Sequence, residues 1–220
     1  MTSRKKWRPP NPKPSKVTSH HRVRTVTIIA IVASLVILGY VSRSIAPSKR
    51  AAKSVGYAIG TPSSGALAPD FSLPSTSGTT VNLVDFRGKS VLLFFHEGIG
   101  CQPCWDQIRD LESARSTLQA AGVDQLLTIT SGPTRLIAQK MADDRLTAIA
   151  LGDTNLEVSK KYHANQFGMM GDSRDGHSFV LVGPDGRIDW RADYGGPPRY
   201  TMYVPLSKIL ADMKAGRSAA

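Results

Sequence analysis

The two cysteines of this chain stand three positions apart, in the stretch Cys101-Gln102-Pro103-Cys104, and the 220 residues contain no other cysteine. The apolar run from Val91 to Phe95 predicts a buried strand before them, and the residues from Pro103 onward predict a helix. At the start of a helix, unpaired backbone N–H groups and the helix dipole favour the thiolate, the form that attacks disulfides and peroxides. The stretch therefore predicts redox chemistry.

We expect Cys101, which is nearer the strand and the more exposed of the two, to attack a substrate disulfide. Cys104, one helical turn later, would resolve the mixed disulfide and leave a Cys101–Cys104 bond. Pro103 suits the first helical turn because no N–H is needed there. A purely structural disulfide is the alternative, but a two-residue loop constrains the unfolded chain little, so stability is a poor reason for such a bond.

Metal binding is a second reading of two cysteines at this spacing. Outside the N-terminal tail, the other soft ligands are His96, His163 and His177, and their spacings match no zinc motif. We therefore predict neither a metal site nor an organic cofactor. Copper(I), which favours soft thiolate ligands, stays open as an alternative for the cysteine pair.

Several other side chains are candidates for a role beside the dithiol. His177 could transfer protons there, because an imidazole titrates near neutral pH, but a partly exposed loop histidine without a chemical role is the expectation. We expect Glu97 to be solvated and Arg191 to be a surface residue at a strand end. Met169-Met170 is expected to fill the core, although a groove for an apolar substrate is conceivable there, and Trp105 is expected to pack at the start of its helix.

The elements that must hold the dithiol alternate between strands and helices. A hairpin is expected at 68–83, around Gly78. The other predicted strands cover 90–96, 124–130, 147–151, 178–182 and 187–191, and the predicted helices cover 103–121, 134–142, 155–162 and 204–214. This order predicts an α/β fold with a central mixed sheet and helices on both faces, antiparallel at the last hairpin.

The net charge of +11 is concentrated outside this region. Twelve of the 28 basic residues lie in 1–24 and 43–53, which hold no acidic residue, and this leaves 16 basic against 17 acidic residues elsewhere. A nearly neutral domain does not predict a nucleic-acid partner.

The uncharged stretch Thr25 to Ser42 is long enough to span about 27 Å as a helix, close to the hydrocarbon core of a bilayer. A cleaved signal peptide is the competing interpretation, but the apolar run is longer than the usual apolar region of such peptides. We favour a transmembrane signal anchor. The basic residues before it predict a cytoplasmic N-terminus and an extracytoplasmic domain, where disulfide chemistry is supported.

The predicted organisation follows from these segments. It comprises a basic, disordered cytoplasmic tail at 1–24, the anchor at 25–42, a linker at 43–66, a redox domain at 67–215 and a disordered C-terminus at 216–220.

Four motifs resemble the redoxin superfamily, which shares the thioredoxin fold. They are Ala68-Pro69-Asp70-Phe71-Ser72-Leu73, Leu83 to Lys89 leading into the strand, the cysteine pair, and Phe179 to Ile188. This superfamily contains the alkyl hydroperoxide reductase/thiol-specific antioxidant proteins and the membrane-tethered thiol-disulfide oxidoreductases of cytochrome c maturation. The resemblance covers residues 66 to 214 and implies a thioredoxin-like fold and an oxidoreductase that acts on thiols and disulfides.

The chain departs from both branches of this superfamily. The peroxidase branch has Thr or Ser three residues before the attacking cysteine and Pro seven residues before it, where this chain has Gly98 and Phe94. The oxidoreductase branch has Trp directly before the first cysteine and a cis-proline before the strand at 178–182, where this chain has Gly100 and Gly176-His177.

One further departure concerns the proton carrier. Many tethered oxidoreductases have an acidic residue three positions after the second cysteine, where this chain has Gln107, and Asp106 and Glu97 are the nearest acidic substitutes.

The leading hypothesis is a single-pass, membrane-tethered extracytoplasmic thiol-disulfide oxidoreductase, with protein thiols or disulfides as substrates and a separate redox partner. A thiol peroxidase with Cys101 as the peroxidatic residue is one alternative, and a copper-binding or copper-delivery protein is the other.

Overall fold

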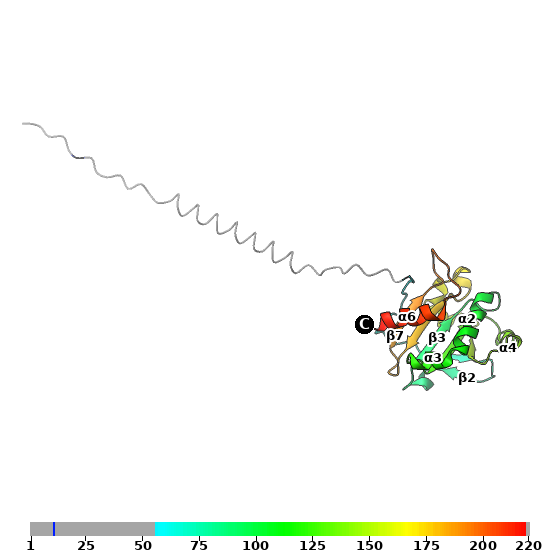
Figure 1. Ribbon diagram of the computed structural model, residues 1–220. Coiled ribbons are helices and arrows are strands. Elements are labelled where there is room, and N and C mark those ends of the chain that lie inside the picture. The colour runs from blue at the N-terminus through cyan, green and yellow to red at the C-terminus, as the bar shows by residue number, and fades with distance from the viewer. Residues whose placement is uncertain (1–10, 12–55, 219–220) are drawn as a thin grey trace, which may run out of the picture. The chain divides into compact units, whose positions relative to one another are not determined.

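The computed structural model describes residue 11 and residues 56–218, and the account below concerns that part of the chain (Figure 1). No helix within it is long and apolar enough to cross a membrane. The anchor predicted at Thr25–Ser42 lies outside the described residues, and so does nearly all of the predicted tail.

Five strands form the central sheet, in the order β5-β4-β3-β6-β7. They are β3 (Val91–Phe95), β4 (Gln125–Thr130), β5 (Ile149–Gly152), β6 (Ser178–Val182) and β7 (Ile188–Asp193). β4 pairs in parallel with β3 and β5, and β6 pairs in antiparallel fashion with β3 and β7. The mixed sheet predicted from the alternation of strands and helices is thus confirmed, and β3, which leads to the cysteines, lies at its centre.

The helices are α2 (Gln102–Ser113), α3 (Arg115–Ala120), α4 (Thr134–Asp143), α5 (Glu157–Lys161) and α6 (Leu206–Arg217), with short 3-10 turns at Leu83–Phe86, Ala164–Gln166 and Gly171–Ser173. The prediction of a single helix at 103–121 was wrong, because the helix is interrupted at Ala114. Ser113 Oγ donates to Arg109 O at 2.7 Å, and such a bond from a serine back to the preceding turn bends a helix.

The sheet has an apolar core on each face. Leu92 and Phe94 belong to the core that is covered by α2, α3, α4 and α6. Leu93 and Phe95 belong to the core that is covered by α5 and the N-terminal hairpin of β1 (Ser72–Pro74) and β2 (Thr80–Asn82). Every residue of β3 is buried, as expected of a central strand with both faces covered.

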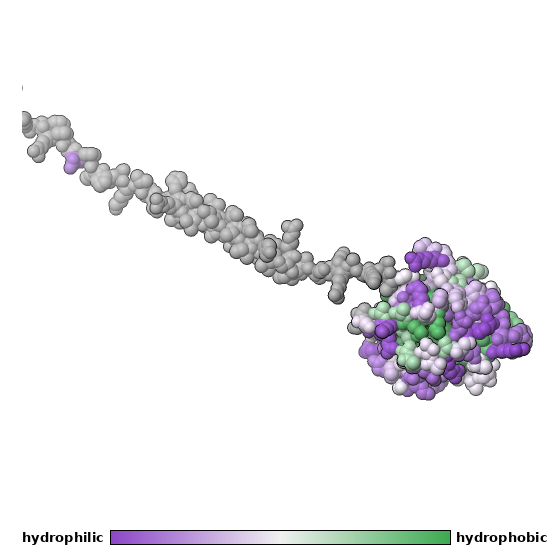
Figure 2. Space-filling model, in the orientation of Figure 1, coloured by the Kyte–Doolittle hydropathy of each residue, from purple (hydrophilic) through white to green (hydrophobic). Residues whose placement is uncertain are grey.

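The surface over the first of these cores contains an apolar groove. Figure 2 shows hydrophobic residues gathered on the viewed face between α6 and α3. The groove is open to solvent, and its apolar lining includes Ala120, Ala121, Leu210 and Met213. None of the residues around the cysteines lines it.

The packed part of the chain extends beyond the predicted domain limits. Ala58 pairs with Asp193 at the end of β7, and Leu67 pairs with Arg187 directly before β7. Residues 58–66, which were predicted as linker, therefore already run along the sheet edge. At the other end, α6 continues to Arg217, where the guanidinium lies 3.9 Å from an Asp189 carboxylate oxygen.

Candidate active site

Cys101 and Cys104 are joined by a disulfide bond, with their Cα atoms 5.3 Å apart. Cys101 is the N-cap of α2, and its carbonyl accepts a hydrogen bond from the Cys104 N–H at 3.0 Å. Their exposed fractions are 5% for Cys101 and 0% for Cys104, so Cys101 is the more exposed residue of the two. Pro103 lies in the first turn, which holds no acidic residue that would oppose the positive end of the helix.

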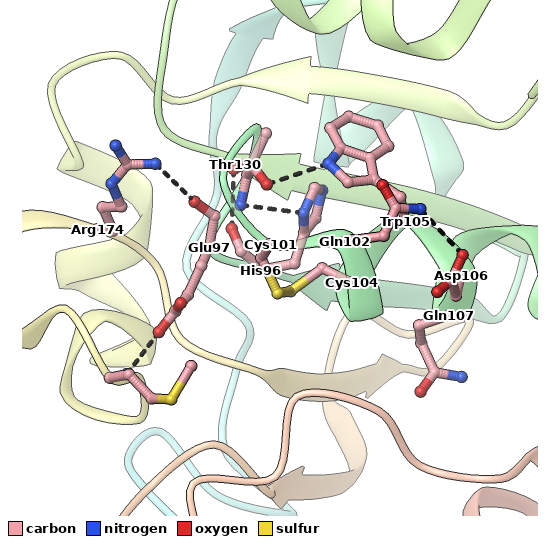
Figure 3. The surroundings of a disulfide bond; sticks show 12 residues. His96, Glu97, Cys101, Gln102, Cys104, Trp105, Asp106, Gln107, Thr130 and Arg174 are labelled. Carbon is pink, nitrogen blue, oxygen red and sulfur yellow. Dashed lines mark hydrogen bonds between the residues drawn. A yellow bond between two sulfur atoms is a disulfide. The ribbon is translucent and has the colours of Figure 1, made fainter. Parts of the chain in front are cut away.

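The loop between β3 and α2 is held by side chains from two neighbouring elements. Trp105, which is buried at the start of α2 as predicted, donates from Nε1 to Gly98 O at 3.1 Å. Thr130, at the end of β4, donates from Oγ1 to His96 O at 2.8 Å, and the Gly98 N–H donates to His96 Nδ1 at 3.3 Å. Figure 3 shows these contacts converging beside the disulfide. They fix the loop that presents Cys101.

Glu97 is not solvated as expected, because only 5% of it is exposed. Its carboxylate accepts a hydrogen bond from the Met169 N–H, and its carbonyl accepts one from Arg174 Nη1 at 3.2 Å (Figure 3). Met169 and Met170 do not fill the core, since 58% and 53% of them are exposed. The loop before β6 is therefore tied to the loop that precedes the cysteines.

His177 does not lie partly exposed in a loop. It is fully buried, and neither ring nitrogen has a hydrogen-bond partner. Its ring packs against that of Phe94 in a T-shaped arrangement, with the centroids 4.8 Å apart. Burial lowers the pKa of His177 to about 3, with a smaller contribution from His96. The imidazole is therefore neutral at physiological pH, and titration near neutral pH no longer supports a role in proton transfer.

Gln107 is also fully buried, one turn of α2 beyond Cys104. Its Oε1 accepts a hydrogen bond from the Val204 N–H at 2.7 Å, so the amide joins α2 to the segment after β7. Asp106, the nearest acidic neighbour, receives hydrogen bonds from Gln102 and Arg109, which hold its pKa below its ordinary value.

Arg191 was wrongly expected on the surface, for it is 1% exposed. It binds Asp193 through two hydrogen bonds, Nε to Oδ2 at 2.8 Å and Nη2 to Oδ1 at 3.0 Å, and it donates from Nη1 to Pro62 O at 3.1 Å. The bond to Pro62 fastens residues 58–66 to β7.

Met202 is a neighbour of the cysteines that the sequence did not reveal. It forms a small buried cluster with Cys101 and Cys104 and is itself 7% exposed. No motif marks it, because about a hundred residues and four strands separate it from the cysteines. In residues 56–218, no group of three or more His, Cys, Asp or Glu side chains is arranged to hold a metal ion.

A disulfide at the start of a helix, presented by the central strand of a mixed α/β sheet, defines a thiol oxidoreductase of thioredoxin-like fold. The model of the AhpC/TSA family matches residues 64–191, more than half of the chain. The chain belongs to the AhpC/TSA family.

Individual relatives represent both branches of thiol chemistry. The chain is 33% identical over 130 residues to Peroxiredoxin Bcp of Escherichia coli, covering 57% of this chain and 81% of that protein. It is 30% identical over 121 residues to Thiol-disulfide oxidoreductase ResA of Geobacillus thermodenitrificans, covering 55% of this chain and 62% of that protein. The crystal structure of Peroxidoxin BcpB from Mycobacterium tuberculosis superposes with a TM-score of 0.58 at 18% identity, covering 70% of this chain and 97% of that one, and it supports the fold alone.

Proposed function

We propose that this chain is a thiol-disulfide oxidoreductase that works through Cys101 and Cys104. The observation that carries the proposal is the Cys101–Cys104 bond itself, which joins the N-cap of α2 to a residue of its first turn. Because the two sulfurs meet within one turn of a single helix, the pair can open and close without rearrangement of the sheet or of the other helices.

The reaction in the reducing direction has two steps. The Cys101 thiolate attacks one sulfur of a substrate disulfide, so that a mixed disulfide forms and the other substrate sulfur leaves as a thiolate. The Cys104 thiolate then attacks Sγ of Cys101, so that the intramolecular bond forms and the second substrate thiolate leaves. The substrate gains two electrons and the protein loses two. A separate dithiol partner must return them.

The proposed setting is the outer face of a membrane. The apolar stretch Thr25–Ser42, with basic residues before it, supports a single-pass anchor with a cytoplasmic N-terminus and an extracytoplasmic redox domain. Protein thiols or disulfides on that side of the membrane would be the substrates.

A thiol peroxidase is the second candidate, and the identity with Peroxiredoxin Bcp favours it. In that reaction Cys101 attacks the peroxide and becomes a sulfenic acid while an alcohol or water leaves, and Cys104 then displaces hydroxide to form the disulfide. Gly98, three residues before Cys101, is an argument against the peroxidase, because that branch has Thr or Ser at this position. A Cβ there would lie 2.5 Å from Thr130 Oγ1, so the loop has no room for a hydroxyl-bearing side chain.

Trapping with Cys104→Ser separates these functions. We expect this variant of the full-length chain to accumulate mixed disulfides with protein partners through Cys101, and the matched Cys101→Ser variant to capture none. Formation of a sulfenic acid at Cys101 with peroxide, without protein capture, would instead establish the peroxidase. Labelling of the same variant in whole cells with a membrane-impermeant maleimide tests the location, because a cytoplasmic Cys101 stays unlabelled.

A further inference from the structure

The disulfide is almost closed off from solvent, and a residue distant in sequence packs against it. Cys104 is 0% exposed and Cys101 is 5% exposed, and Met202 packs against both. Met202 belongs to residues 200–205, the last part of the connection between β7 and α6, and we call these residues the strap. Any substrate must approach the Cys101 sulfur beside this strap.

Two side chains of α2 hold the strap in place. Gln107 Oε1 accepts a hydrogen bond from the Val204 N–H at 2.7 Å, and Asp110 accepts one from the Tyr203 hydroxyl. The two anchored residues directly follow Met202. Figure 3 shows Gln107 pointing away from the disulfide and toward the segment after β7.

The connection from β7 is also fixed where it leads into the strap. The Thr201 N–H donates to Tyr194 O at 3.1 Å. A Cβ on Gly195 would lie 2.1 Å from Phe167 O, and one on Gly196 would lie 2.8 Å from the Phe167 ring. This close approach leaves the beginning of the connection little freedom, so movement of Met202 depends on the contacts that Gln107 and Asp110 make.

We propose that the strap selects substrates by size and that Met202 is the specificity-determining residue. With the strap in place, Cys101 reacts with a narrow substrate, such as a small disulfide or an organic hydroperoxide. A cysteine on a bulky folded partner reaches the sulfur only when the strap lifts. This proposal rests on the proposed function and names the substrate shape that the site admits.

Gln107 acquires a defined role in this arrangement. An acidic residue at its position would serve as a proton carrier, but this amide is buried and its oxygen is bonded to the strap. Gln107 is therefore a positioning residue that acts through Met202. Reduction of the disulfide leaves both anchors in place, because neither Gln107 nor Asp110 is part of the dithiol.

The test measures access to Cys101 directly. In the reduced, full-length Cys104→Ser chain, Cys101 is the sole thiol. Its alkylation rate is measured with N-ethylmaleimide and with the same maleimide attached to a long polyethylene glycol chain. The ratio of the bulky rate to the small rate reports how often the strap is open, and it needs no catalytic turnover.

Removing one of the two hydrogen bonds that hold the strap is expected to raise this ratio about 2- to 10-fold, which corresponds to the net free energy of one hydrogen bond. Tyr203→Phe removes the bond to Asp110 at a partly exposed site and therefore leaves folding intact. Gln107→Met removes the buried acceptor, and Gln107→Glu, which keeps an oxygen near the Val204 N–H, is expected to restore a low ratio. Met202→Ala is expected to give the largest increase.

Two matched variants serve as controls. Tyr200→Phe alters an exposed tyrosine of the same strap, and Met169→Ala alters an exposed methionine outside it. Both are expected to leave the ratio unchanged. Equal ratios in all variants, or equal acceleration by both reagents, would overturn the proposal. The alkylation needs only a free Cys101 thiol, so failure of the strap and failure of disulfide exchange are separate results.

Discussion

His96 and His177 both contact the ring of Phe94, with ring centroids 5.3 Å and 4.8 Å away respectively. Both histidines are fully buried, and burial lowers the pKa of each to about 3. The folded protein therefore keeps both imidazoles neutral in the range where the unfolded chain takes up protons, near pH 6.5. The two imidazoles beside Phe94 therefore add no positive charge to the protein interior at neutral pH.

The stability of the protein should fall in mild acid for this reason. A lowered folded-state pKa contributes stability that is complete above about pH 6.5 and is lost as the pH falls toward 3. Between pH 7.5 and pH 5, each histidine is expected to lower the free energy of unfolding by about 2 kcal/mol. Urea unfolding at both pH values should show that His177→Phe loses about 2 kcal/mol less than the wild type. His163→Asn, at an exposed histidine, should match the wild type, and equal losses in all three proteins would contradict the prediction.

A buried pair of carboxyl groups makes the stability of the protein depend on pH in the opposite direction. Ser159 Oγ donates to Asp153 Oδ2 at 2.6 Å and also contacts Asp175 Oδ1. Since a serine hydroxyl carries a single proton, one of the two carboxyl groups must supply the proton of the other contact, and Asp153 already accepts hydrogen bonds from two backbone N–H groups. Burial raises the pKa of Asp175 well above its ordinary value. This group therefore contributes stability below about pH 4 that is lost as the pH rises toward its folded-state pKa.

Replacing Asp175 by Asn should remove this loss. The amide can donate to Ser159 Oγ as the protonated acid does, so the variant is expected to match the wild type near pH 4 and to exceed it at pH 8 by at least about 1 kcal/mol. Guanidinium unfolding at the two pH values measures this. Asp143→Asn, at an exposed carboxylate, is the control. An Asp175→Asn variant that is less stable than the wild type at pH 8 would mean that Asp175 is ionised in the fold.

The fold was predictable because its signals are local. The apolar run of β3 and the Gly-Pro-Asp-Gly turn between β6 and β7 each lie within a dozen residues, and the observed strands β3 and β6 lie within the predicted ranges. The position of the cysteines at a strand-to-helix junction follows from the same patterns. Helix continuity was less predictable, because the break at Ala114 depends on a side-chain hydrogen bond at Ser113.

The surroundings of the dithiol were not predictable from local patterns. Glu97 is bonded to Met169 and His177 packs against Phe94, each some seventy or more residues away in the chain, and Met202 meets the cysteines only through the connection between β7 and α6. Arg191 did carry an overlooked signal. Alternate residues of a strand share a face, so the sequence Arg191-Ala192-Asp193 places opposite charges side by side.

Breaking this pair should be costly. Arg191→Met leaves the Asp193 carboxylate buried without its partner and removes the bond to Pro62, so a loss of about 3–5 kcal/mol in the free energy of unfolding is expected. Limited proteolysis should then cut within residues 58–66. Arg187→Met, whose nearest carboxylate is 4.0 Å away on a largely exposed Asp185, should cost at most about 1 kcal/mol. Combining Arg191→Met with Asp193→Leu should recover most of the loss, and no recovery would show that the ion pair is not its cause.

Gly98 controls the loop that presents Cys101, and two glycine substitutions test how. Gly98 and Gly78 have nearly the same backbone angle, φ +84° and +83°, but a Cβ meets Thr130 Oγ1 at 2.5 Å at the first position and open space at the second. Gly78→Ala should therefore cost only the conformational penalty, about 1–2 kcal/mol. Gly98→Ala should cost more and should also slow disulfide exchange, because Thr130 must release the His96 carbonyl. Urea unfolding and exchange with a small disulfide measure the two effects. If Gly98→Ala and Gly78→Ala behave alike in both assays, Thr130 does not set the position of Cys101.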